Sequence, residues 1–196
     1  MASDTTLIGY LPKRIVRETE YVGTPPLPGV EEVCSVSECI SKSPPDWVDC
    51  WLHNTDTWLF DDPGSAWWVV PETEREHYRL YAYRLLPTLF HDSEKETALT
   101  LPEIKAAPIP ANFVRIGYDA VVRQLDDPHI GSFGCSPLSC NYMAEEYQVN
   151  RYCLVDDLDT ALTMARDFAT GNCEPGPYCV VEVWTQGPGR GARKGV

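Results

Sequence analysis

Four of the eight cysteines form two pairs that share one spacing. Each pair reads Cys-Ser-x-x-x-Cys, with Cys34 and Cys39 in the first copy and Cys135 and Cys140 in the second. Structural zinc sites commonly hold the metal with four cysteine or histidine side chains, so the two pairs together would supply a full set of thiolates. Neither pair has the tighter cysteine spacing of the usual zinc motif. The alternative is that these cysteines are small buried side chains that hold tight turns.

Thiol catalysis is a third interpretation of the same residues. A cysteine becomes a nucleophile when a nearby base or positive charge stabilises its thiolate. The four histidines lie outside both motifs, and only His53 and His129 come near one in the sequence. The Asp-Pro-His-Ile-Gly context of His129 is typical of a turn. The sequence therefore gives this interpretation little support.

Other landmarks recur around the cysteine motifs in the same order. Gly9-Tyr10 precedes the first motif as Gly117-Tyr118 precedes the second, and an apolar strand-like run closes each half, over 80–85 and over 178–184. We interpret this order as an internal duplication. It predicts an α+β protein in which two related halves pack around a shared core, because one such unit alone buries little surface. The expected parts are a first α+β repeat over 1–87, a linker over 88–112, a second α+β repeat over 113–186 and a flexible basic tail over 187–196.

Helix-start signals follow each cysteine motif. Asp62 before Pro63 predicts a capped helix, because the carboxylate accepts from free N–H groups and proline at the first helical position has none to lose. Asp156 predicts a second cap. It precedes an apolar stripe at helical spacing over 158–169, and Gly171 is the expected end of that helix.

The remaining elements are shorter. Trp47 and Trp51 are four residues apart and predict one apolar face of a short helix. The run 118–123 alternates as a strand does, and 151–155 predicts another strand. A first strand is expected within 7–18, where Pro12 indicates either an edge strand or an interruption of the strand.

Composition narrows the class of protein. The chain has 196 residues, 43% of them hydrophobic, and a net charge of −13. This charge disfavours nucleic acid, whose phosphates would be repelled. An acidic surface can attract a protein partner with a basic surface, and the commoner alternative is a solvated surface that improves solubility. We see no apolar run long enough for a membrane span and no signal-peptide pattern at the start, so we expect a cytoplasmic protein with reduced cysteines.

The second half resembles the layout of ADP-ribosyltransferase-like folds. The resemblance rests on the strand ending in Arg123, the serine-containing segment, the capped helix and the closing strand. It implies an NAD site and a transferase or hydrolase activity, with Arg123, Ser136, Tyr152 and Glu182 as the residues to test. The Ser-Thr-Ser triplet and the Glu-x-Glu or Gln-x-Glu context of those enzymes are missing. In the alternative interpretation, Glu182 is a polar residue on the solvated side of a strand.

A second resemblance covers most of the chain. Cys-Ser-Pro-Leu-Ser-Cys-Asn, and later Pro-Gly-Pro-Tyr-x-Val-Val-Glu-Val-Trp, resemble motifs of a family of small uncharacterised bacterial proteins. The resemblance implies a bacterial, cytosolic origin and carries no activity with it. The leading functional expectation is therefore a non-enzymatic protein that binds a basic partner or a small ligand. An NAD-using enzyme and a structural zinc protein are the alternatives, with NAD or zinc as the cofactor.

Overall fold

The structure, a computed structural model, is an α+β fold with one antiparallel sheet; it describes residues 5–17, 28–93, 95–124, 129, 132–140, 143–171 and 173–187. The expected tail beyond Gly187 lies outside these ranges. The strands are β1 (Thr6–Arg14), β2 (Tyr78–Leu85), β3 (Thr88–Phe90), β4 (Glu96–Ala98), β5 (Phe113–Val122) and β6 (Tyr178–Gln186). The helices are α1 (Pro63–Trp68), α2 (Pro137–Cys140) and α3 (Leu158–Thr170), with 3₁₀ turns η2 (Trp47–Asp49), η3 (Glu72–His77) and η4 (Met143–Glu145).

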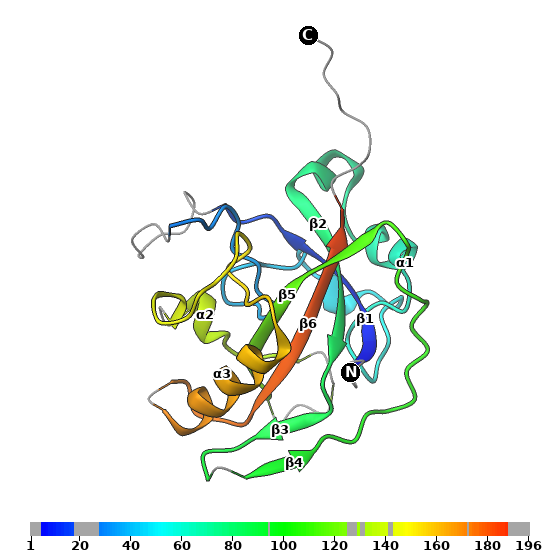
Figure 1. Ribbon diagram of the computed structural model, residues 1–196. Coiled ribbons are helices and arrows are strands. Elements are labelled where there is room, and N and C mark those ends of the chain that lie inside the picture. Colours follow the sequence, from blue (N-terminus) through cyan, green and yellow to red (C-terminus); the bar gives the residue numbers. More distant parts are fainter. Residues whose placement is uncertain are drawn as a thin grey trace.

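Strand β6 lies at the centre of the sheet. It pairs along its whole length with β5 on one side, and on the other side with β2, where Tyr83 faces Val183. Strand β1 pairs with β2, as expected for an edge strand that contains Pro12. Figure 1 shows β5 and β6 side by side with α3 lying across them. The two strands that we predicted to close the halves, β2 and β6, are therefore neighbours.

The segment that we predicted as a linker also extends the sheet. Beyond the end of β2, Phe90 of β3 pairs with Tyr178 of β6, and β4 pairs with β3. Residues 99–112 then run to β5 without a helix or strand. The connection between the halves is thus partly structured.

The two faces of the sheet are covered differently. Side chains alternate between faces along a strand, so Tyr118 and Glu182 share one face and Asp119 lies on the other. On the face of Tyr118, α3 contributes Ala161 and Phe168 to a buried cluster. On the face of Asp119, both cysteine motifs contact the sheet: Ser136 donates to Asp119, and the carbonyl oxygens of Val36 and Ser37 accept from Lys13 on β1.

A distorted strand geometry occurs at both Gly9 and Gly117. Each glycine marks a register shift and has a positive φ, +145° and +147°. A β-carbon on Gly9 would lie 2.6 Å from the Leu59 Cβ, and one on Gly117 would lie 2.7 Å from the Leu154 Cβ. Glycine is therefore required at both bulges, because any side chain would collide with a neighbouring segment.

The segments that contain Leu59 and Leu154 each pair with the neighbouring strand, β1 or β5, through one backbone bridge. Tyr10 exchanges two backbone hydrogen bonds with Phe60, and Tyr118 exchanges two with Val155. The expected strand over 151–155 is therefore wrong in extent, since only Val155 pairs. A turn with a left-handed residue precedes it, Cys153 at φ 58°.

Both predicted helices that begin after an aspartate form. Asp62 caps α1, accepting from the backbone N–H groups of Gly64 and Ser65. The cap of α3 is Asp157, which accepts from the N–H of Thr160. The prediction of Asp156 was wrong by one residue, because Asp156 instead accepts from the side-chain amide of Asn150. Each helix is thus fixed at its start by a local hydrogen bond.

The predicted helical face of Trp47 and Trp51 is absent. The helix there is only the three-residue turn η2, so the two side chains do not stack at helical spacing. Trp47 packs against the core, whereas Trp51 is 83% exposed.

Candidate metal centre

Three cysteines from the two motifs lie together. The sulfur atoms of Cys39, Cys135 and Cys140 are all within 4.8 Å of one another. Cys39 is exposed, and the other two are partly buried. The two motifs are far apart in the sequence, so this cluster joins the two halves of the chain at the molecular surface.

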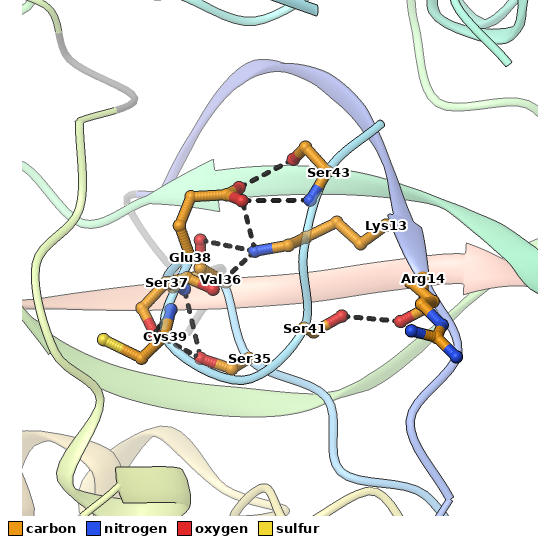
Figure 2. Close-up of polar contacts among 9 residues, drawn as sticks. All are labelled: Lys13, Arg14, Ser35, Val36, Ser37, Glu38, Cys39, Ser41 and Ser43. Atoms are coloured by element: carbon orange, nitrogen blue, oxygen red, sulfur yellow. Dashed lines mark hydrogen bonds and ion pairs between the residues drawn. The ribbon is translucent and has the colours of Figure 1, made fainter. Parts of the chain in front are cut away.

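The loop that carries Cys39 is fixed by a buried ammonium group. Lys13 is fully buried on β1, and its Nζ donates to the carbonyl oxygens of Ser37 (2.6 Å) and Val36 (3.2 Å). It also lies 3.3 Å from the Glu38 carboxylate. Figure 2 shows these contacts, with the Cys39 sulfur directed away from Lys13. A buried charge with several acceptors strongly constrains the atoms around it.

Further polar contacts close the same loop. Glu38 accepts from both the backbone N–H and the hydroxyl of Ser43, at 2.9 and 2.6 Å. The Ser35 and Ser37 hydroxyls lie 2.8 Å apart, and Ser37 Oγ accepts from the backbone N–H of Cys39 at 3.4 Å. The serines of the motif thus hold the backbone in the turn that presents Cys39.

The second motif is fixed by a buried carboxylate. Ser136 donates its hydroxyl proton to Asp119 on β5, at 2.8 Å. The carbonyl oxygen of Ser136 accepts from the backbone N–H groups of Ser139 (3.0 Å) and Cys140 (2.8 Å). At the start of the motif, the backbone of Gly134 and Cys135 pairs with Val122 at the end of β5. Cys135 and Cys140 are therefore placed at the two ends of one short turn.

The pKa values of the three clustered thiols are shifted in different directions. A hydrogen bond from the Cys135 thiol, helped by Ser139 and Cys39, lowers the pKa of Cys140 to about 6, although partial burial opposes this. The same hydrogen bond and burial raise the pKa of Cys135. Burial and the charge of Cys140 raise the pKa of Cys39. Cys140 is therefore the first thiolate of the cluster near neutral pH.

The spacing of the sulfur atoms suits a tetrahedral metal ion. Zinc–sulfur bonds of about 2.3 Å place two thiolate ligands about 3.8 Å apart. The three sulfur atoms, within 4.8 Å of one another, exceed that spacing by about 1 Å at most. Thiolates select soft or borderline ions such as Zn²⁺ over Mg²⁺ or Ca²⁺. The arrangement can hold a zinc ion through three ligands.

Cys34, the fourth cysteine of the two motifs, lies apart from the cluster. Its Sγ is 3.2 Å from the Tyr81 hydroxyl and 3.6 Å from a carboxylate oxygen of Glu32. Burial raises the pKa of Cys34 well above its ordinary value. The structure thus brings together three of the four cysteines that the sequence singled out.

The residues singled out for an NAD site lie in separate environments. Glu182 is buried beside Arg84 and Arg115, at 3.3 and 3.5 Å. It also accepts from the hydroxyls of Tyr118 and Thr5, both at 3.2 Å. This carboxylate is therefore paired within the sheet and not solvated.

The other three members of that set are placed elsewhere. Ser136 contacts Asp119 and Arg123 follows the end of β5, both on the sheet face opposite Glu182. Arg123 donates to the carbonyl oxygens of Gln124 and Ser132. Tyr152 stacks under the guanidinium group of Arg151, 4.8 Å from its ring centre. The described residues do not assemble these four side chains into one pocket.

Two residues that position the cysteines were missed by the sequence analysis. Lys13 and Asp119 each anchor one motif, and both lie on the same face of the sheet. A signal was available, because each is a charged residue within a strand of mainly apolar residues, and such residues are rarely buried without a specific partner.

No family model, curated protein or solved structure matches the chain. Within the part of the chain that the structure describes, no helix is both long and apolar enough to cross a membrane.

Proposed function

We propose that the protein binds one zinc ion through Cys39, Cys135 and Cys140, and that this ion joins the two halves. The observation that carries the proposal is the placement of three sulfur atoms within 4.8 Å of one another. Two independently anchored loops bring them there, one held by Lys13 and the other by Asp119. Turns that only needed small buried side chains would not require their sulfur atoms to converge at the surface.

The first motif offers a matched pair of variants to test this site. We expect the wild-type protein and Cys34→Ala to carry one zinc per chain in native mass spectrometry after purification with a phosphine reductant. We expect Cys39→Ala to lose the metal, because it removes one of three ligands. Retention of zinc by Cys39→Ala, or equal loss from both variants, would contradict the proposal.

We also propose that the two halves arose by internal duplication. The support is the repeated local geometry. Each half has a bulge at a glycine with positive φ, Gly9 in β1 and Gly117 in β5. In each half the residue after that glycine pairs with the segment that precedes an aspartate-capped helix. Such strained features are specific enough that their recurrence in the same order favours a common origin. In this proposal the metal binds at the junction of the two copies.

A second candidate function is the binding of a basic protein partner. Trp51 is 83% exposed and Val48 is 41% exposed on the same surface segment. Exposed carboxylates lie beside them in the sequence, at Asp46 and Asp49. Aromatic faces attract cations, and the net charge of −13 favours a positively charged partner. This surface fits a protein segment that presents lysine or arginine.

A short oligolysine peptide serves as the probe for this surface. We expect Trp51→Ser to weaken peptide binding about two- to five-fold in calorimetry, the value of an exposed cation–π contact. Trp68→Ser removes another exposed tryptophan, 67% exposed, and we expect it to bind as the wild type does. Unchanged binding by Trp51→Ser, or equal losses in both variants, would count against this surface.

We propose a reducing, cytoplasmic setting for both functions. All eight cysteines are free thiols in the structure, including three whose sulfur atoms are close neighbours. Such thiols persist where the surroundings keep cysteine reduced. The bacterial origin implied by sequence resemblance remains a prediction.

A further inference from the structure

We propose that the metal bound by Cys39, Cys135 and Cys140 keeps its fourth coordination position for a low-molecular-weight thiol, which it holds as a thiolate. This inference rests on the proposed metal binding. In this proposal the ligand at the fourth position of the metal exchanges with small thiols, whether or not the metal also stabilises the fold.

The first step is the number of ligands that the chain supplies. All eight cysteines and all four histidines are among the described residues, and only three of them form the cluster. The most buried of the other cysteines are engaged elsewhere: Cys153 donates to the carbonyl oxygen of Leu138 and Cys179 to that of Val121. The described part of the chain thus offers three soft ligands. Zinc sites with three protein ligands generally bind water or substrate at the fourth position, whereas closed structural sites have four.

The second step is access from solvent. Cys39 is exposed, and Cys135 also lines an open cavity of about 390 Å³. Gly134, Glu174 and Gly176 form other parts of the wall. A molecule of several non-hydrogen atoms can therefore approach the cluster without any movement of the core.

The third step is the class of ligand. Three thiolates and a divalent cation carry a net charge of −1, and thiolates donate electron density strongly. The metal is then a weak Lewis acid toward water, while a fourth sulfur ligand matches the softness of the set. Glu174 is exposed at the cavity wall, but its carboxylate is a harder ligand than a thiolate.

The binding step balances without an oxidant or reductant. The thiol R–SH loses its proton to solvent, its sulfur forms a bond to the metal, and a bound water molecule leaves. The metal keeps its oxidation state. Coordination maintains the sulfur as a thiolate at neutral pH, which is the nucleophilic form. The reactions that fit are therefore transfers of a group to a small thiol.

Cobalt(II) is the appropriate probe, because its visible and near-ultraviolet absorption reports both geometry and thiolate number. We titrate the cobalt-loaded full chain, kept reduced with a phosphine, with 2-mercaptoethanol. We expect the sulfur-to-metal charge-transfer absorption to rise roughly in the ratio of four thiolates to three. Ethylene glycol, which replaces the thiol with a hydroxyl, should leave the spectrum unchanged.

The outcomes separate the two proposals. If cobalt does not bind through thiolates at all, the proposed metal site itself fails. If cobalt binds but the thiol leaves the spectrum unchanged, or removes the metal into solution, the exchangeable position is disproved. Glu174→Gln should respond as the wild type does. A thiol response seen only in Glu174→Gln would instead show that Glu174 occupies the fourth position, and would overturn the inference.

Discussion

Asp119 is a buried residue that helps to fix the second cysteine motif. It is fully buried, and its Oδ1 accepts from Ser136. Its Oδ2 has no hydrogen-bond partner among the described residues. Burial is the main reason that the pKa of Asp119 is raised to about 7. The carboxyl group is therefore largely protonated in the folded protein at mildly acidic pH.

This raised pKa predicts a pH dependence of stability. An unfolded aspartate has a pKa of roughly 4, so between pH 4 and 7 the unfolded chain binds fewer protons than the folded one at this position. The contribution of Asp119 to the free energy of unfolding therefore falls as pH rises through that window, and levels off above it.

Asp119→Asn tests this contribution, because asparagine can still accept from Ser136 but does not titrate. Urea unfolding across the pH range should give a smaller decline between pH 4 and 7 for Asp119→Asn than for the wild type. Parallel curves for the two proteins would show that Asp119 is ionised in the folded state throughout.

Among single residues, the sequence pointed to the clustered cysteines but not to Lys13 and Asp119, which hold their loops in place. The repeated spacing singled out Cys39, Cys135 and Cys140, which do converge. It could not separate Cys34 from them, because that difference comes from the tertiary contacts of Cys34 with Tyr81 and Glu32. A charge within an apolar strand signals that Lys13 and Asp119 have buried partners, but those partners are distant in the chain and the local pattern does not identify them.

Among the elements, the bulge at Gly117 has a strict local requirement for glycine. A β-carbon there would lie 2.7 Å from the Leu154 Cβ and 2.8 Å from the Val155 carbonyl oxygen. Gly29 also has a positive φ, +87°, but a β-carbon would meet nothing within 4 Å. A substitution at Gly29 therefore reports the cost of backbone strain alone, whereas one at Gly117 reports the cost of strain and collision together.

We predict that Gly117→Ala destabilises the protein more than Gly29→Ala. Both substitutions incur the strain of a positive φ, of order 1–3 kcal/mol, and Gly117→Ala adds the collision, typically another 1–3 kcal/mol. Denaturant unfolding of both variants measures the difference. Equal losses of unfolding free energy would show that the segment at Leu154 moves away easily.

Elements with strong local signals were predictable from the sequence. Aspartate caps and an apolar stripe located α1 and α3, and the β-branched run located β6. The region around Trp47 and Trp51 was mispredicted because the spacing of two tryptophans is a weak helix signal. There, Asp46 adopts a left-handed conformation and the 3₁₀ turn η2 ends after three residues.

For the whole molecule, the pairing of β2 with β6 gives the relation between the halves. These strands run antiparallel, with Tyr83 opposite Val183, and each has the glycine-bulged strand of its own half on its outer side. The relatedness of the two halves stays a proposal, and the sequence did not predict how they meet, because strand pairing between distant segments has no local signal. That pairing puts both cysteine motifs over one sheet face, where their sulfur atoms can converge.

The most direct measurement of the central claim is X-ray absorption at the zinc edge of the metal-loaded wild-type protein, without added thiol. We predict three sulfur neighbours at about 2.3 Å and one lighter oxygen or nitrogen neighbour. This count would show that the three clustered cysteines bind the metal together. A zinc ion surrounded only by oxygen and nitrogen, or a protein that takes up no zinc, would contradict the claim.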